Sequence, residues 1–420
     1  MTPLLRPLSA ADLGAQRHDP VDAATLAQAQ AILDAVAAGG EAALRAEAHR
    51  LGDLPQLDAP LVHGPAALRA AWEGLDPAAQ GVLARAAGRI RSFADAQRAA
   101  LGPLELPVPG GRAGLRYAPV ERAGCYAPGG RFPLPSSVLM TAVTARAAGV
   151  AEVWVASPRP GPVTLAAAHV AGADALLAVG GAQAIGAFAY GAGPVPAVDA
   201  IVGPGNRWVT AAKQRVAGRV AIDMLAGPSE LLVLADGGAD PGLIAADLLA
   251  QAEHDPDALP VLISLDPGLP ARVDAALRAQ LADLPTAEVA RAALQNGGCV
   301  VLGDLGAACA LCDRVAPEHL ALHLADPAPA VARLRHHGAL FVGALSAEAL
   351  GDYGAGPNHV LPTGGTARRF GALSVMTFLR VQTWLALDDR AAAAGLVADC
   401  AALGRMEGLE AHARSADRRA

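Results

Sequence analysis

Short apolar segments alternate with helical stretches after about residue 120, and this alternation constrains the fold more than any other feature of the chain. Such alternation is typical of βαβ units, in which parallel strands are covered by helices. The number of segments predicts two parallel sheets, and therefore an α/β fold with two Rossmann-like, incomplete domains. Ligands of such sheets usually bind at the carboxyl ends of the strands. The apolar segments are residues 150–156, 175–179, 200–202, 220–222, 231–234, 261–265, 300–302 and 340–342.

The flanking regions have a different pattern. Residues 1–20 are irregular and are expected to form an N-terminal arm, whereas residues 21 to about 101 carry Ala, Leu and Arg at helical spacing. From about residue 377 onward the pattern again predicts helix. We expect residues 21–120 with 230–372 to form one α/β domain. Residues 121–229 would form a second, and residues 373–420 a small C-terminal helical appendage.

Composition excludes several classes of protein. The formal net charge is −7 and no basic run occurs, so nucleic acid is not an expected partner. Residues 175–198 are uncharged and long enough to span a bilayer, but Gly180-Gly181 and two prolines favour a buried strand, a turn and a helix. Neither a membrane span nor a signal peptide is predicted, and a cytoplasmic location is expected.

Cysteine and lysine usage adds two points. Five cysteines in a chain of this size are expected to be reduced thiols. Cys309 and Cys312 have redox or metal-binding spacing, but their apolar surroundings favour buried structural thiols. Lys213 is the only lysine. Either a bias toward arginine left one lysine, or this position needs a compact ammonium group.

An acid–base pair, Glu318-His319, directly follows Pro317. Proline disfavours helix at Ala316, so the pair is expected to begin a new element. Imidazole titrates near neutral pH, and a neighbouring carboxylate can stabilise imidazolium or deprotonate water. The alternative is a solvated pair at the start of a helix.

Two glycine-rich turns suggest close approach to a ligand. Residues 124–131 lead into residues 133–140, where Ser136 is expected to cap a helix. Residues 202–207 resemble a dinucleotide-binding turn, but Trp208 stands at the third glycine position. An ordinary Rossmann NAD site is therefore not supported by this motif.

Candidate metal ligands lie near the end of a predicted helix. Gln251 and His254 are three residues apart and could share a cation, although a histidine that interacts with the helix dipole explains the spacing equally well. Asp352 and His359 lie in a second polar loop. Glu407 and His412 lie near the C-terminus, where a solvated helix is the simpler interpretation.

Taken together, these segments resemble the L-histidinol dehydrogenase family over roughly residues 20–415. The motifs that carry the resemblance occur in this order: GCYAPGGR, PLPSSVLM, GGAQAIGAFAYG, GPGN, AGPSE, QAEHD, APEHL, GDYGAGPNHVLPT and EGLEAH. The resemblance implies a zinc-dependent, four-electron oxidation of L-histidinol to L-histidine through the aldehyde, with two NAD⁺. It further implies a homodimer with shared active sites and one Zn²⁺ per subunit.

The same resemblance assigns the site residues. His319 would take the alcohol proton, and Glu318 would activate water to hydrate the aldehyde. Zn²⁺ would be bound by Gln251, His254, Asp352 and the partner subunit's His412. Substrate would contact Ser229 and Glu407 as well as Gln251, His254, His319, Asp352 and His412, with His359 a weaker candidate. NAD would contact Tyr126, Gln183 and Asn206.

Two departures and two alternatives accompany this interpretation. Phe132 and Thr144 stand where the family pattern has Ala and Pro, both beside the expected NAD loop, so they bear on NAD affinity. A dehydrogenase of a related amino alcohol would use the same residues. A zinc hydrolase would need an open metal position for water, but would have no use for Tyr126, Gln183 and Asn206.

Overall fold

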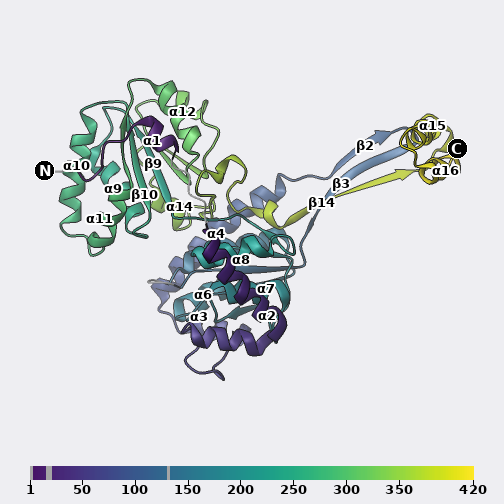
Figure 1. The fold of residues 1–420 in the computed structure, drawn as a ribbon, viewed down its shortest axis with the longest axis horizontal. Coiled ribbons are helices and arrows are strands. Elements are labelled where there is room, and N and C mark those ends of the chain that lie inside the picture. The colour runs from purple at the N-terminus through teal and green to yellow at the C-terminus, as the bar shows by residue number, and fades with distance from the viewer. Residues whose placement is uncertain (1–2, 16–20, 130–132) are drawn as a thin grey trace.

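The computed structural model describes residues 3–15, 21–129 and 133–420 (Figure 1). In this part of the chain the strands form three sheets. Two of them are wholly or almost wholly parallel and are covered by helices, as predicted. The third is an antiparallel sheet that extends away from both domains.

Sheet 1 has the strand order β1-β6-β5-β4-β7-β8, and only β1 runs antiparallel to its neighbour. Successive side chains of its central strands point to opposite faces of the sheet and join two apolar cores: Cys125 contributes to one core and Tyr126 to the other. The strands are β1 (Val62–His63), β4 (Arg122–Tyr126), β5 (Glu152–Ala156), β6 (Ala175–Leu177), β7 (Ala200–Val202) and β8 (Ala221–Ile222).

Seven helices of the described chain cover sheet 1. Helix α2 packs on α7 and α8, α3 packs on α6, and α4 packs on α5. Asp22 and Asp76 cap the starts of α2 and α4 through their carboxylates. The helices are α2 (Ala23–Arg50), α3 (Pro65–Glu73), α4 (Pro77–Ala99), α5 (Pro135–Ala148), α6 (Pro162–Ala171), α7 (Gly181–Tyr190) and α8 (Arg207–Val216).

Sheet 2 is fully parallel, with the order β11-β10-β9-β12-β13. Its strands are β9 (Glu230–Ala235), β10 (Leu259–Ser264), β11 (Gly298–Val301), β12 (His319–His323) and β13 (Ala339–Val342). One face is covered by α9 (Pro241–Ala252), α10 (Leu269–Leu281) and α11 (Ala287–Asn296). The other is covered by α1 (Ala10–Ala15), α12 (Leu305–Val315) and α13 (Ala328–Val331), and α14 (Glu348–Asp352) follows β13.

The third sheet, called the arm sheet here, has the order β14-β3-β2. Its strands are β2 (Leu104–Val108), β3 (Gly111–Pro119) and β14 (Leu379–Leu387). Helices α15 (Arg390–Met406) and α16 (Glu410–Asp417) lie at its far end (Figure 1). Two short 3₁₀ helices, η1 (Thr366–Arg368) and η2 (Val375–Phe378), precede β14.

Three sequence-based expectations need correction. Residues 21–102 do not join the sheet 2 domain, because α2, α3 and α4 bury their apolar residues against sheet 1. The region after residue 377 is not wholly helical, because residues 379–387 pair with β3. Ser136 does not cap α5, whose N-cap is Leu134, since Pro135 occupies the first helical position.

Other expectations are confirmed. Residues 175–198 form β6, a turn and α7, and within the described residues no helix is long and apolar enough to cross a membrane. All five cysteines are free thiols, and Cys309 and Cys312 are buried on α12. The N-terminal segment packs on sheet 2, where the Leu8 N–H donates to the Cys299 carbonyl at 2.8 Å.

Candidate active site at the amino edge of sheet 2

The Glu318-His319 pair begins a new element, as Pro317 predicts. Ala316 has a φ of 52° and ends α12, and β12 starts at His319. Both side chains are buried, with His319 only 3% exposed. The alternative of a solvated pair at a helix start is therefore wrong.

Glu230, the first residue of β9, fixes both members of the pair. The Glu230 N–H donates to Glu318 Oε2 at 2.8 Å, and the Glu318 N–H donates to Glu230 Oε2 at 3.3 Å. His319 Nδ1 lies 3.0 Å from the Glu230 carbonyl oxygen. Because a carbonyl only accepts, Nδ1 carries a proton, and in the neutral imidazole Nε2 is the nitrogen that can take one.

His319 lies among carboxylates. Its Nδ1 is 3.6 Å from Glu318 Oε2 and 3.8 Å from Glu348 Oε1, and its Nε2 is 3.8 Å from Asp352 Oδ1. Burial alone would lower the pKa of His319, but the negative charges of Glu318, Glu348 and Asp352 outweigh it and raise that pKa to about 10. Burial also raises the pKa of Glu348 to about 8, although the neighbouring His319 opposes this shift.

The donor atoms of His319, Glu348 and Asp352 lie within 4.8 Å of one another, a spacing at which a cation could bind. Such a dense group of buried acids favours a compensating positive charge. Glu348 and Glu230 are absent from the residues predicted for the site. Glu230 was visible only as the last residue of the AGPSE motif, and Glu348 lies in a short helix without a distinctive motif.

Gln251 gives an independent sign of a ligand. It is fully buried on α9, and within the described structure neither polar atom of its amide has a hydrogen-bond partner. An unpaired buried amide is unfavourable unless something else binds it. His254 follows in the turn after α9. Burial raises the pKa of Asp352, but the interactions with His319, His359 and His254 together outweigh burial and lower that pKa. Gln251, His254 and Asp352 have donor atoms of the kinds that a zinc ion could use.

The loop after Asp352 is tied to helix α5. His359 Nδ1 lies 2.9 Å from the Asp352 carbonyl oxygen, and its Nε2 lies 3.3 Å from Ser137 Oγ. Burial lowers the pKa of His359, which favours a neutral ring that donates from Nδ1 and accepts at Nε2. Asn358 Nδ2 donates to Thr144 Oγ1 at 3.1 Å, so Thr144 contacts this loop. Phe132 lies outside the described residues.

The position of the site differs from expectation. Ser229, Glu230 and His319 lie at the amino ends of β9 and β12, and Gln251 and His254 precede β10, so the site is at the amino edge of sheet 2 and not its carboxyl edge. Residues 223–229 connect the carboxyl end of β8 directly to this edge. The Gly227 N–H donates to Thr363 Oγ1, and Thr210 Oγ1 donates to the Ala226 carbonyl at 2.8 Å, which ties the connection to both domains.

Ser229 is half-buried at this edge, where the structure also gathers Glu318, His319 and Asp352. Two predicted residues are not brought there by the same chain. Glu407 ends α15 and His412 lies in α16, both exposed at the tip of the arm and far from α14 (Figure 1).

The predicted NAD residues gather at the carboxyl edge of sheet 1. The chain leaves β4 toward β5 on one side, whereas β7 lies on the other, so a topological switch point lies between β4 and β7. Tyr126 ends β4, and its hydroxyl accepts from the Gly181 N–H at 3.2 Å. Asn206 follows β7 and caps α8, and Gln183 Nε2 donates to Asp53 Oδ2 at 3.3 Å. Of the described atoms, Gln183 Oε1 is another buried acceptor without a partner.

Lys213 supports the turn that carries Asn206. It is 2% exposed, pairs with Asp223, and donates to the Gly203 carbonyl at 3.0 Å. Asp223 Oδ2 in turn accepts from the Gly203 N–H at 2.7 Å. Gly203 has a φ of 116°, and a Cβ there would lie 2.0 Å from the Tyr126 carbonyl oxygen. The single lysine is thus buried against a carboxylate and a carbonyl oxygen. This supports the interpretation that the position needs a compact ammonium group, and not that a bias toward arginine left one lysine by chance.

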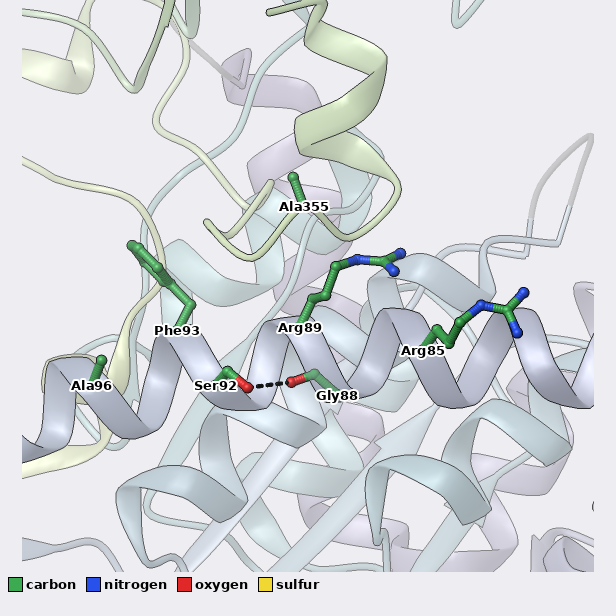
Figure 2. A pocket seen from close by; sticks show the side chains of 7 residues that line it. All are labelled: Arg85, Gly88, Arg89, Ser92, Phe93, Ala96 and Ala355. Atoms are coloured by element: carbon green, nitrogen blue, oxygen red, sulfur yellow. Dashed lines mark hydrogen bonds between the residues drawn. The ribbon is translucent and has the colours of Figure 1, made fainter.

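An open groove of about 630 Å³ lies between α4 and the loop that follows Asp352. Figure 2 shows Arg89 extending from α4 toward the loop that carries Ala355, and Arg89 Nε donates to the Gly354 carbonyl at 2.5 Å. None of its described lining residues belongs to the predicted proton-transfer, metal or NAD sets. The lining residues are Arg85, Gly88, Arg89, Ser92, Phe93, Ala96 and Ala355.

Comparisons with known proteins show which family the chain resembles. The family model described as histidinol dehydrogenase matches residues 15–420. The chain is 51% identical to a histidinol dehydrogenase of Thermus thermophilus, covering 92% of this chain and 93% of that protein. It is 43% identical to that of Ralstonia nicotianae, covering 96% and 97%. The crystal structure of histidinol dehydrogenase from Elizabethkingia anophelis is 28% identical, with a TM-score of 0.93 over 100% of this chain and 98% of that chain. The chain therefore belongs to the histidinol dehydrogenase family.

Proposed function

We propose that this protein oxidises L-histidinol to L-histidine in two NAD⁺-dependent steps, with a bound Zn²⁺ and a site shared between two subunits. The observation that carries the proposal is the buried Glu318-His319 pair, whose His319 Nε2 has no partner among the described atoms, together with the unpaired buried amide of Gln251. Family membership supports the substrate and the cofactors. As a biosynthetic enzyme, the protein is expected to act in the cytoplasm.

In the first step, His319 Nε2 takes the proton of the substrate hydroxyl while hydride leaves the carbinol carbon for NAD⁺. The products are the aldehyde and NADH. The Glu230 carbonyl holds Nδ1–H, so the ring presents Nε2 with a fixed orientation.

In the second step, Glu318 takes a proton from water as the water oxygen attacks the aldehyde carbon. The carbonyl oxygen takes the proton that His319 Nε2 gained in the first step and becomes the second hydroxyl of the gem-diol, which leaves His319 neutral again. His319 then takes a hydroxyl proton while hydride leaves for the second NAD⁺, which gives the carboxylic acid. Glu318 Oε2 is held by the Glu230 N–H, so Oε1 is the oxygen oriented for water.

Gln251, His254 and Asp352 would hold the Zn²⁺, and the partner's His412 would complete its ligands. When bound, the ion would orient the imidazole and amine of the substrate and offset the negative charge around His319.

The arm sheet supports a dimer. Residues paired across its strands share a face, and this places Leu106, Leu115, Val381, Leu385 and their neighbours together on one apolar face. Leu385 is 61% exposed and Val381 is 60% exposed. The opposite face carries Arg112, Arg116 and Gln382. A large exposed apolar face is typical of a subunit interface, and pairing of two arms would carry α16, with His412, to the other subunit.

The first test is NADH formation from L-histidinol, measured as NADH produced per substrate consumed with metal-loaded and chelator-treated protein. We expect two NADH per histidinol and loss of activity after chelation. A metal-loaded dimer that forms no NADH would exclude L-histidinol and direct the search to related amino alcohols.

A further inference from the structure

We propose that Glu230 is the positioning residue that orients Glu318 and His319 for proton transfer. The inference rests on the proposed function, because it assigns Glu230 a part in the two proton-transfer steps. Glu230 is not expected to contact substrate, metal or NAD. Its role is argued from the bonds that join β9 to β12.

The main chain of Glu230 contacts both catalytic side chains. Its N–H donates to Glu318 Oε2 at 2.8 Å, and its carbonyl oxygen accepts a hydrogen bond from His319 Nδ1–H at 3.0 Å. Adjacent parallel strands place these groups side by side, since His319 pairs with Leu231. A single peptide segment therefore determines the orientation of both the carboxylate and the imidazole.

The side chain of Glu230 fixes that segment in turn. Its Oε2 accepts from the Glu318 N–H at 3.3 Å, and its Oε1 accepts from the Gly364 N–H at 2.9 Å. The Glu230 N–H also donates to the Glu318 side chain, so the two residues form a closed ring of two hydrogen bonds. The bond from Gly364 joins this ring to the loop that follows Thr363. Both oxygens of a buried carboxylate are thus used as acceptors from main-chain N–H groups, an arrangement that costs desolvation and is not required for a β-ladder.

Glu230→Gln separates orientation from folding. The amide is nearly isosteric and keeps one acceptor, but its NH₂ group must face one of the two main-chain N–H donors, so one bond is lost. Burial raises the pKa of Glu230 to about 7, so an uncharged side chain is tolerated at this position. We expect the variant to fold cooperatively and to keep its zinc content.

The test is a double-mutant cycle on the aldehyde step, measured as NADH formation from L-histidinaldehyde. In the wild-type background, Glu230→Gln is expected to lower kcat about 10- to 100-fold and to change KM less than about twofold. In a Glu318→Gln background, the same substitution is expected to lower kcat clearly less than in the wild-type background, because Glu318 no longer acts as a base and only the orientation of His319 remains to be disturbed. Glu73→Gln, at an exposed position at the end of α3 in the other domain, is the matched control.

Equal losses of kcat in the two backgrounds, or a rise in KM without a fall in kcat, would overturn the inference. If Glu230→Gln alters the melting temperature, Glu230→Asp serves as the second variant. It keeps the charge but withdraws both oxygens, and it must give the same difference between the two backgrounds. A wild-type protein that forms no NADH counts against the proposed function itself, whereas an active wild type with additive variants counts against Glu230 alone.

Discussion

Individual carboxylates decide the charge state of the site. Burial raises the pKa values of Glu230 and Glu318 to about 7 in the folded chain, from 4.5. These groups are buried and held in main-chain hydrogen bonds, so their protonation is coupled to folding.

This coupling predicts a pH-dependent stability in the metal-free protein. Between about pH 4.5 and 7 the folded state binds more protons than the unfolded state, so the unfolding free energy falls as pH rises. The loss is on the order of 3 kcal/mol for each group at most. Urea denaturation at pH 5, 6 and 7 measures it, and Glu230→Gln should flatten the curve. An unfolding free energy that rises between pH 5 and 7 would contradict the raised pKa values of Glu230 and Glu318.

Local sequence patterns predicted only part of this site. Glu318 and His319 could be predicted because proline, acid and base are adjacent in sequence. Glu230 acts on them from 88 residues away, through a strand pairing that no local pattern encodes. Glu348 lies in a short helix and reaches His319 only after β13 is in place.

At the scale of elements, the GPGN turn depends on helix α8 behind it. Lys213 and Asp223 form a buried ion pair that binds both polar groups of the Gly203 peptide unit. Removing one member of such a pair leaves the other charge uncompensated.

Lys213→Met is therefore expected to destabilise the protein by about 3–5 kcal/mol and to weaken NAD⁺ binding. Thermal unfolding and NAD⁺ titration measure the two effects. Arg215→Met, an exposed change on the same helix, is the control and should leave both unchanged. Equal stability of the two variants would show that the buried pair contributes little.

Elements that are marked by a short apolar run of their own were predicted well. The segment 200–202 is β7, and 231–234 lies within β9. Residues 379–387 were wrongly predicted as helix because their partner, β3, is more than 260 residues away and alanine-rich α15 follows directly. Helices α2, α3 and α4 were placed on the wrong sheet, since an apolar stripe does not specify which sheet it covers.

At the scale of the whole molecule, the exposed apolar face of the arm sheet predicts that a charge placed on it will prevent dimer formation. Leu385→Asp places a charge on that face and should shift the protein from dimer to monomer, with loss of activity. Ala386→Asp changes the adjacent residue on the opposite face and should remain dimeric. Sedimentation or light scattering distinguishes the two; a dimeric, active Leu385→Asp protein would exclude this face as the interface.

A shared site also predicts complementation. His412→Asn and Asp352→Asn proteins should each be inactive, but co-refolded in equal amounts they should recover about a quarter of wild-type activity. Half of the molecules would be heterodimers, each with one intact site of two. No recovery, despite heterodimers in solution, would place all of the ligands within one chain.

Because the chain has a single lysine, proteolysis at that residue can measure local unfolding of α8. An endoprotease specific for lysine has one substrate bond in the whole chain, between Lys213 and Gln214, and that bond is out of reach while α8 is packed. Cleavage would yield two fragments of nearly equal length at a rate set by the population of the open state. Because occupancy of the cofactor turn stabilises the closed helix, NAD⁺ should slow the cut, so a gel can follow cofactor binding without any label.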